Sequence, residues 1–280
     1  MWSLLEYFHQ KIEITVLDIG AALSEQPPYQ PLLDAGCARI IGFEPNAEEC
    51  ARLNTEYAGK PHVFYPYFVG DGQPATFHET NWSLTGSLYE PNTPLLEVFQ
   101  NLAELVTPVG THSVKTTCID DIAEIQDVDF IKIDIQGGEL NVFRHALRIL
   151  PATLLIQTEV EFLELYKQQP MFSDIDPFLR GQGFQFHTFN GFGGRAFKPV
   201  LPNNDVNTPV RQMLWSDAIY VRDWMRLSAL PEPKLIKYAV LAHDVLQSFD
   251  LAHYVLLELD RRTGKALAPA YLQRLSTAAE

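Results

Sequence analysis

Residues 131–139, with the sequence IKIDIQGGE, constrain the fold of this chain more than any other segment. An apolar strand there runs into Asp134, and a glycine turn then opens a helix. Two more predicted strands end in the same way: residues 14–19 carry Asp18 before a glycine turn, and residues 39–43 lead into Glu44. In open α/β sheets, ligands bind beyond the carboxyl ends of the strands. Three acidic strand ends at one crevice therefore predict a site for a nucleotide-like cofactor.

The order of the predicted elements indicates an α/β fold, because strands separated by helical patterns form right-handed βαβ units and a parallel sheet. Besides the two strands above, we expect strands at residues 62–69, 129–135, 153–159, 184–190 and 218–222. The expected helices lie at residues 27–36, 46–57, 139–150 and 174–181. Residues 70–119 interrupt this alternation with β-like segments at 75–80 and 83–88 and an amphipathic helix at 93–105.

A chain of 280 residues with 46% hydrophobic content can bury one large core and a small appendage. We expect a Rossmann-like domain over residues 1–225, starting with a short amphipathic helix, and a helical extension over residues 226–280 that caps the domain or mediates homo-oligomerisation. The connection at 191–215 is long and rich in Gly, Pro and Asn, which is typical of functional lids and of disordered loops.

The charge balance narrows the class of partner. The chain has 35 acidic against 21 basic residues, a formal charge of −14, which disfavours binding to nucleic acid and to anionic membranes. We find no apolar run of the roughly 18 residues that a membrane-spanning helix needs, and no signal-peptide pattern at the start. The three cysteines are widely spaced and lack a CxxC pattern, which predicts buried thiols. A cytoplasmic protein is the expectation.

The first glycine turn bears on the kind of cofactor. Dinucleotide binding needs three spaced glycines so that the backbone can approach a pyrophosphate, but Gly20 is followed by Ala21 and then by Ala-Leu-Ser. S-adenosylmethionine has no pyrophosphate and needs only a tight turn here. Glu44, 26 residues after Asp18, is placed to bind both ribose hydroxyls. Taken alone, the Asp18 segment fits an ordinary strand-to-turn junction equally well.

Three motifs together, DIGA at 18–21, GFEP at 42–45 and IKIDIQGGE at 131–139, resemble the FkbM family of S-adenosylmethionine-dependent methyltransferases. The similarity extends from about residue 14 to 223. It implies the class I methyltransferase fold, a mostly parallel seven-stranded sheet whose last strand is antiparallel. It also implies methylation of hydroxyl groups on sugars and polyketides. The chain departs from the family at Ala22-Leu23-Ser24, where Asn-x-Gly is usual, and at Gln136, where many members carry Glu.

We assign two sets of site residues. The cofactor-binding set is Asp18, Gly20, Ala21, Glu44, Asp71 and Ser87. Asp71 is placed to reach the adenine amino group, although a type I turn explains it nearly as well. The catalytic set is Asp134 and Glu159.

Each catalytic candidate has an alternative role. The resemblance implies that Asp134 faces the cofactor's amino group or the acceptor, and its alternative role is to cap a helix. Glu159 is a candidate base or acceptor contact, or it pairs with Lys132 or Arg144. His78 and His187 are further candidate bases, but a lone histidine on a strand more often packs. The negative charge of Glu139 is favourable at the positive N-terminus of the helix predicted at 139–150, which is a structural role. A divalent ion would need a third oxygen ligand beside Asp134 and Glu159, so we assign no metal-ligating residues and metal dependence stays open.

The late loop carries a possible acceptor-binding cluster. Trp215 with Arg195, Lys198 and Arg211 would close over a polar acceptor, or the loop is simply solvated. The favoured function is an S-adenosylmethionine-dependent methyltransferase, O-directed, acting on a small-molecule or carbohydrate acceptor. The alternatives are a nicotinamide-dependent oxidoreductase, which the missing glycines disfavour, and a non-catalytic binding protein on the same fold.

Overall fold

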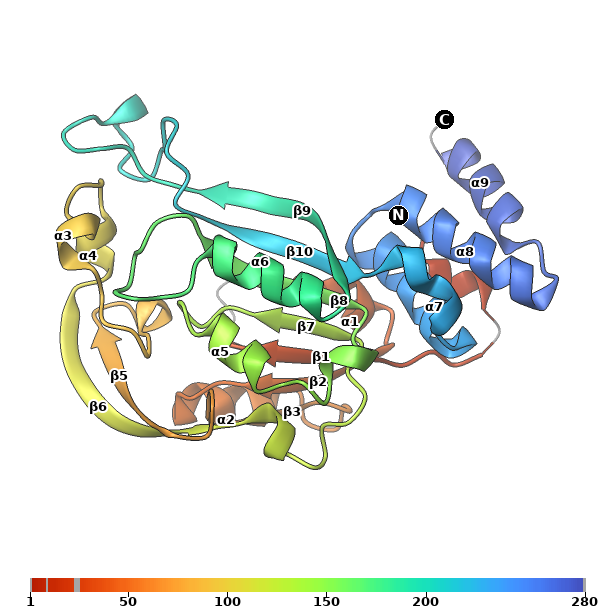
Figure 1. The fold of residues 1–280 in the computed structure, drawn as a ribbon, viewed down its shortest axis with the longest axis horizontal. Coiled ribbons are helices and arrows are strands. Elements are labelled where there is room, and N and C mark those ends of the chain that lie inside the picture. The colour runs from red at the N-terminus through yellow and green to blue at the C-terminus, as the bar shows by residue number, and fades with distance from the viewer. Residues whose placement is uncertain (1, 9, 23–25, 279–280) are drawn as a thin grey trace.

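A computed structural model describes residues 2–8, 10–22 and 26–278 (Figure 1). Its centre is a seven-stranded sheet with the order β3-β2-β1-β7-β8-β10-β9. The strands are β1 (Ile14–Ile19), β2 (Ala38–Phe43), β3 (Val63–Tyr65), β7 (Phe130–Ile133), β8 (Leu155–Glu161), β9 (Phe184–Gly193) and β10 (Trp215–Arg222). β10, the last along the chain, is antiparallel to both neighbours, and the other pairs are parallel. The predicted fold class is confirmed.

The register of the sheet brings the acidic strand ends together. β1 lies between β2 and β7, with Asp18 opposite Gly42 on one side and opposite Lys132 on the other. Every residue of β1 is buried, as expected for a parallel strand covered on both faces. Because parallel strands end at the same edge, Gly20, Glu44 and Asp134 follow at one edge of the sheet.

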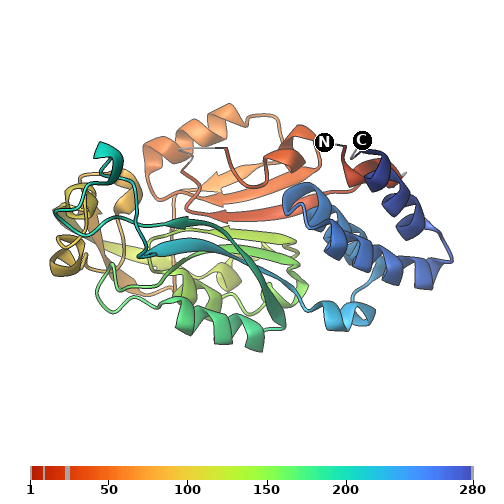
Figure 2. The ribbon, with the colours of Figure 1, turned by 90° about the horizontal axis from the view of Figure 1, so that it is seen from above.

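Helices cover both faces of the sheet (Figure 2). Alternate β1 residues face opposite ways, so Ile14 and Val16 pack in one core and Leu17 and Ile19 in the other. The first core is closed by α1 (Gln30–Asp34), α2 (Ala47–Glu56), α7 (Glu232–Val240), α8 (Phe249–Thr263) and α9 (Leu267–Ala278). The second is closed by α5 (Glu139–Arg144) and α6 (Phe172–Gly181).

The C-terminal helices share a core with the sheet, near the start of the parallel strands (Figure 1). Leu235 and Ala239 of α7 belong to the same buried cluster as Ile14. The N-terminal segment also packs there, and the short helix that we expected is a 3-10 helix at Leu4–Tyr7. The domain boundary at residue 225 stays a prediction.

A second, three-stranded sheet projects from the carboxyl edge. It has the order β4-β6-β5, from β4 (Phe68–Val69), β5 (Pro74–Thr80) and β6 (Pro108–Thr117). The strand expected at 62–69 is divided between the two sheets, with a break at Pro66, which cannot donate to a ladder. The strand expected at 83–88 is instead a 3-10 turn at Ser83–Thr85.

A small cap of short helices lies beside the arm that is formed by β4, β5 and β6. The helix expected at 93–105 is two short helices, α3 (Thr93–Leu96) and α4 (Leu102–Leu105), because Asn101 adopts a left-handed conformation at φ 58°. Both pack with Leu165, Tyr166 and Leu214 in a third apolar cluster, separate from the two cores of the sheet. The cap is therefore assembled from segments far apart in the sequence.

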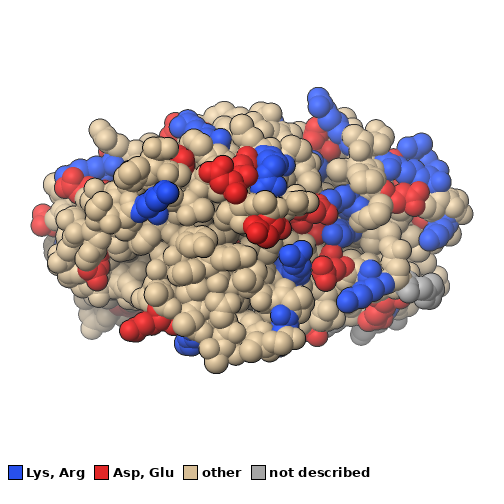
Figure 3. Space-filling view, turned by 90° about the horizontal axis from the view of Figure 1, so that it is seen from below, with Lys and Arg blue, Asp and Glu red and all other residues tan. Residues whose placement is uncertain are grey.

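Three further expectations from the sequence concern the surface charges, membrane-spanning helices and the cysteines. On the face in Figure 3, Lys and Arg side chains are scattered among Asp and Glu around an uncharged area. Within the described residues, no helix has the length and apolar character needed to cross a membrane. Cys37 and Cys50 are buried, Cys118 is partly exposed, and all three are free thiols.

Candidate active site

The turn after β1 brings two strand ends into close contact. Gly20 has φ +81°, and a Cβ there would lie 2.0 Å from the carbonyl oxygen of Asp134. The N–H groups of Gly20 and Ala21 both donate to the Phe43 carbonyl oxygen, at 3.0 Å each. Position 20 therefore requires glycine, and the turn joins the ends of β1, β2 and β7.

A buried ion pair supports this turn from behind. Lys132 Nζ donates to the Gly20 carbonyl oxygen at 2.9 Å and lies 3.5 Å from Asp18 Oδ1. Tyr29 donates its hydroxyl proton to Asp18 Oδ2 at 2.5 Å. Burial raises the pKa of Asp18, against the lowering effect of Lys132. Asp18 and Ala21 are each 1% exposed and lie behind the cavity wall, so their direct contact with a cofactor stays a prediction.

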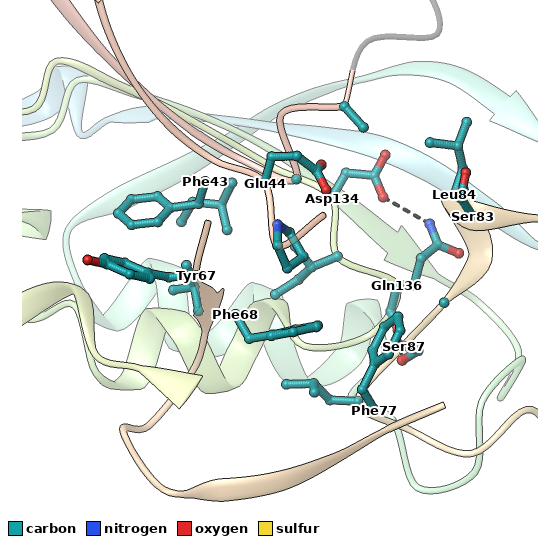
Figure 4. Close-up of a pocket in the computed structure, with 18 of the residues that line it drawn as sticks. Phe43, Glu44, Tyr67, Phe68, Phe77, Ser83, Leu84, Ser87, Asp134 and Gln136 are labelled. Carbon is teal, nitrogen blue, oxygen red and sulfur yellow. Dashed lines mark hydrogen bonds between the residues drawn. The ribbon is translucent and has the colours of Figure 1, made fainter. Parts of the chain in front are cut away.

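A first cavity opens beyond the turn (Figure 4). Glu44 lies on one wall near Asp134, and the aromatic rings of Phe43, Tyr67 and Phe68 form much of the rest. Glu44 Oε1 accepts a hydrogen bond from the Asn46 N–H at 2.7 Å, which fixes the carboxyl group. Burial raises the pKa of Glu44. An aromatic wall beside a fixed carboxylate suits an adenosine, since the rings pack on the base and the carboxylate accepts from ribose hydroxyls.

The other two assigned cofactor residues differ in their placement. Ser87 lines the first cavity, donates its hydroxyl proton to the Gln136 carbonyl oxygen at 2.6 Å and accepts from the Tyr89 N–H at 2.9 Å. Asp71 lies outside this lining, where its Oδ1 accepts from the Gln73 N–H at 2.9 Å. This bond stabilises a turn and lowers the pKa of Asp71. Its contact with adenine stays a prediction.

A second cavity adjoins the first and shares Leu84, Asp134 and Gln136 with it. Gln136 connects the polar groups of both. Its Nε2 donates to Asp134 Oδ1 at 2.9 Å and to Glu159 Oε2 at 2.7 Å. Its Oε1 accepts from the Tyr166 hydroxyl at 3.0 Å. The structure thus brings both predicted catalytic residues together, through an amide that we had noted only as a departure from the family.

Two carboxyl groups of β8 face the second cavity. Glu159 and Glu161 are two positions apart, so they point to the same side of the strand. Burial, followed by the neighbouring carboxylates, raises the pKa of each well above its usual value. Sequence reasoning missed Glu161, which the alternation along β8 would have indicated. It also missed Tyr166, for which no sequence signal exists.

Glu139 supports the turn that carries Gln136. Its Oε1 accepts from the N–H groups of Ile135, at 2.8 Å, and Gly137, at 3.3 Å. The side chain is fully buried, and burial raises the pKa of Glu139 to about 7. The role is structural, as predicted, but it acts through these turn amides.

The predicted cationic cluster does not form as one group. Arg195 stacks on Trp215, with the guanidinium carbon 5.5 Å from the ring centre, and both line the second cavity. Lys198 instead donates to Glu104 Oε1 at 2.9 Å, and Arg211 is exposed. The two histidine candidates, His78 and His187, line neither cavity. Within the described ranges, no three His, Cys, Asp or Glu side chains are arranged to hold a metal ion.

Comparisons with known proteins bear on the family of this chain. A family model described as the methyltransferase FkbM domain matches residues 18–186. The chain is 28% identical, over 171 residues, to the 2-O-methyltransferase NoeI of Sinorhizobium fredii, covering 51% of this chain and 68% of that protein.

Two solved structures resemble the chain only weakly. One is an S-adenosylmethionine-dependent methyltransferase of Aquifex aeolicus, with 12% identity, a TM-score of 0.33 and coverage of 77% of this chain and 87% of that one. The other is an antibiotic-related methyltransferase, with 12% identity, a TM-score of 0.35 and coverage of 75% and 90%. The fold assignment rests on the sheet topology and on the family model.

The sheet order, the antiparallel last strand and the cavity at the carboxyl edge define a class I methyltransferase, whose cofactor is S-adenosylmethionine. The chain belongs to the FkbM methyltransferase domain family. The family model gives no support to the nicotinamide-dependent alternative.

Proposed function

We propose that this methyltransferase acts on a hydroxyl group of a small-molecule or carbohydrate acceptor held in the second cavity. The observation that carries the proposal is the pair of adjoining cavities with Asp134 and Gln136 in their shared wall. A cofactor in the first cavity and an acceptor in the second would meet at these residues. The relation to a 2-O-methyltransferase supports oxygen as the target atom.

S-adenosylmethionine supplies an electrophilic methyl group when it is bound, so the protein's task is alignment and proton removal. Glu44 would accept hydrogen bonds from the ribose. Gln136, held by Tyr166, keeps the Asp134 and Glu159 side chains in place. Glu159 is the proposed base, because it faces only the second cavity and its raised pKa makes it a stronger proton acceptor than an exposed carboxylate.

Binding of S-adenosylhomocysteine tests the cofactor half of the proposal. In E44Q we expect roughly 10- to 100-fold weaker binding by calorimetry, since one charge-assisted hydrogen bond is lost. E48Q is the matched control, because Glu48 is exposed on α2 and does not line the cavity. Equal affinity of E44Q and wild type would exclude the ribose contact.

Turnover tests the catalytic half, with a panel of sugars, glycosides and small alcohols and detection of the transferred methyl group by mass spectrometry. For an acceptor found in this way, E159Q should lower kcat by roughly 10²- to 10⁴-fold, as is typical for loss of a general base. Affinity for S-adenosylhomocysteine should stay the same, because Glu159 does not line the first cavity. Full activity of E159Q would remove Glu159 from the mechanism, and a methylated nitrogen in the product would contradict the choice of oxygen.

A further inference from the structure

We propose that the acceptor carries a positively charged amino group, which binds at Glu161 in the second cavity, beside Glu159. This inference rests on the proposed function and deepens it by naming a substrate class. The geometry behind it is an excess of buried carboxyl groups over basic groups around that cavity, together with one buried carboxyl oxygen that has no partner.

The charges that line the second cavity do not balance. Three acidic side chains line it, those of Asp134, Glu159 and Glu161, against the single guanidinium of Arg195. Glu139 is fully buried just behind, and it interacts electrostatically with both β8 carboxyl groups. Bringing like charges together in a poorly solvated site is unfavourable unless a cation accompanies them.

The basic groups of the site are already engaged elsewhere. Lys132 bonds the Gly20 carbonyl oxygen and pairs with Asp18, on the side of the first cavity. Arg195 donates to the Gly194 carbonyl oxygen at 2.8 Å and lies over the Trp215 ring. Neither makes a salt bridge to Glu159 or Glu161. The cofactor's own positive charge would lie at the shared wall near Asp134, whereas Glu159 and Glu161 line only the second cavity.

Glu161 supplies the second, independent observation. Its side chain is 1% exposed and lines the second cavity, and Oε2 makes no hydrogen bond, although the neighbouring Gln169 amide lowers the pKa of Glu161 against the effect of burial. An unpartnered buried oxygen of this kind is costly. An ammonium group has three donors and a positive charge, so it can bond this oxygen and leave the Glu159 carboxyl group to take up the hydroxyl proton. The three acidic side chains are not arranged as a metal ligand set, which favours an ammonium group over a divalent ion.

Apart from these charged groups, the lining of the second cavity is largely apolar. Leu96, Leu102, Leu105 and Leu165 line the cavity, and the rings of Trp82 and Trp215 complete the wall. An acceptor that fills the cavity therefore combines an amino and hydroxyl-bearing end with an apolar or ring portion. An amino sugar glycoside with an aromatic aglycone has this composition, and it allows a matched comparison with its neutral analogues.

The test is calorimetric binding to protein saturated with S-adenosylhomocysteine, so that no turnover is needed. The probes are the 4-nitrophenyl glycosides of glucosamine, glucose and N-acetylglucosamine, with cyclohexylamine and cyclohexanol as a smaller pair. We expect each amine to bind with at least about tenfold higher affinity than its neutral analogue, which is the effect expected of one charge-assisted hydrogen bond. Equal binding of amine and neutral members, or no saturable binding by any amine, would overturn the proposal.

Variants locate the effect. E161Q keeps the shape of the side chain and should reduce the amine preference to less than about threefold, with neutral probes and S-adenosylhomocysteine unaffected. E97Q, at an exposed position outside the second cavity, should keep the preference of wild type. A titration with MgCl2 is included, and saturable Mg²⁺ binding that E161Q abolishes would replace the ammonium group by a metal ion and count against the proposal.

The two proposals fail separately. If a neutral sugar is methylated on oxygen and the protein binds amines no more tightly than their neutral analogues, the proposed function stands and this inference falls. If amines bind preferentially but no hydroxyl is methylated, the cation site stands and the choice of a hydroxyl acceptor falls.

Discussion

Gly20 is where the backbone itself limits what the side chain can be. In G20A, the added methyl group would meet the Asp134 carbonyl oxygen at 2.0 Å, and the residue would keep an unfavourable φ of +81°. Strained φ values alone cost on the order of 1–3 kcal/mol. We expect G20A to lose at least this much unfolding free energy by chemical denaturation, and to bind S-adenosylhomocysteine poorly because the turn must move.

Gly36 offers a matched control for this substitution. It also has a positive φ, +65°, but an added Cβ would meet nothing within 4 Å. G36A should therefore show the backbone cost alone and retain cofactor binding. If both variants behaved alike, the close approach of β1 and β7 would not be what requires glycine at position 20.

The sequence predicted which strand ends reach the site, but not how each side chain is used. Glu44 and Asp134 line the first cavity as expected, since each directly follows a parallel strand. Asp18 lies within β1, one residue before the strand ends, and points toward Tyr29 and Lys132 instead. That direction depends on packing against α1 and β7, which distant residues supply and no local pattern records.

The contact of α7 with the sheet depends on a buried ionic cluster at the start of β7. Asp129 is fully buried and accepts from Lys234 Nζ at 2.6 Å and Lys237 Nζ at 2.7 Å. D129N would leave two partly buried ammonium groups without their main partner. Breaking a buried pair typically costs about 3–5 kcal/mol, and we expect a loss of that order in urea denaturation.

Asp127 provides the comparison for this cluster. It also contacts Lys234 Nζ, at 2.5 Å, but its side chain is 60% exposed. Exposed pairs contribute about 0–1 kcal/mol, so D127N should be nearly as stable as wild type. A large loss in D127N, or a small one in D129N, would mean that burial does not decide the strength of this contact.

Regular elements were easier to predict than the arm and the cap. The strands of the main sheet and α2, α5 and α6 follow from apolar runs and helical spacing, with errors mainly at their ends. β6 was missed because most of its residues are exposed on a projecting arm, so no apolar alternation marks it. The division of the helix expected at 93–105 depends on Asn101 and on contacts with residues near 165 and 214, which local spacing cannot reveal.

The buried acidic groups should also make stability depend on pH. The pKa of Glu139 is about 7 in the folded protein, above the 4.5 of an exposed glutamate. Its contribution is fully present below pH 4.5, where both states hold the proton, and is lost as pH rises toward 7, where only the unfolded state has released it. The pKa values of Glu159 and Glu161 are also raised, so both groups change the stability in the same direction.

E139Q isolates this effect, because an amide keeps an acceptor for the Ile135 and Gly137 N–H groups but does not ionise. Relative to wild type, E139Q should gain on the order of 2–3 kcal/mol of unfolding free energy between pH 4.5 and pH 8. Urea denaturation of both proteins across this range measures the gain. A difference that stays constant with pH would contradict the raised pKa of Glu139.

The two ends of the described chain pack against each other. The centre of the Trp2 ring lies 5.7 Å from the centre of the Tyr271 ring and 4.1 Å from the guanidinium carbon of Arg274. This contact is at the start of the parallel strands (Figure 1), whereas the cavities lie beyond the carboxyl ends of these strands. A fluorophore or an immobilising group attached at residue 2 or residue 274 would therefore stand at the opposite end of the sheet from both cavities. Surface-tethered protein should report the affinities of protein in solution, which makes sensor-chip screening of acceptors practical.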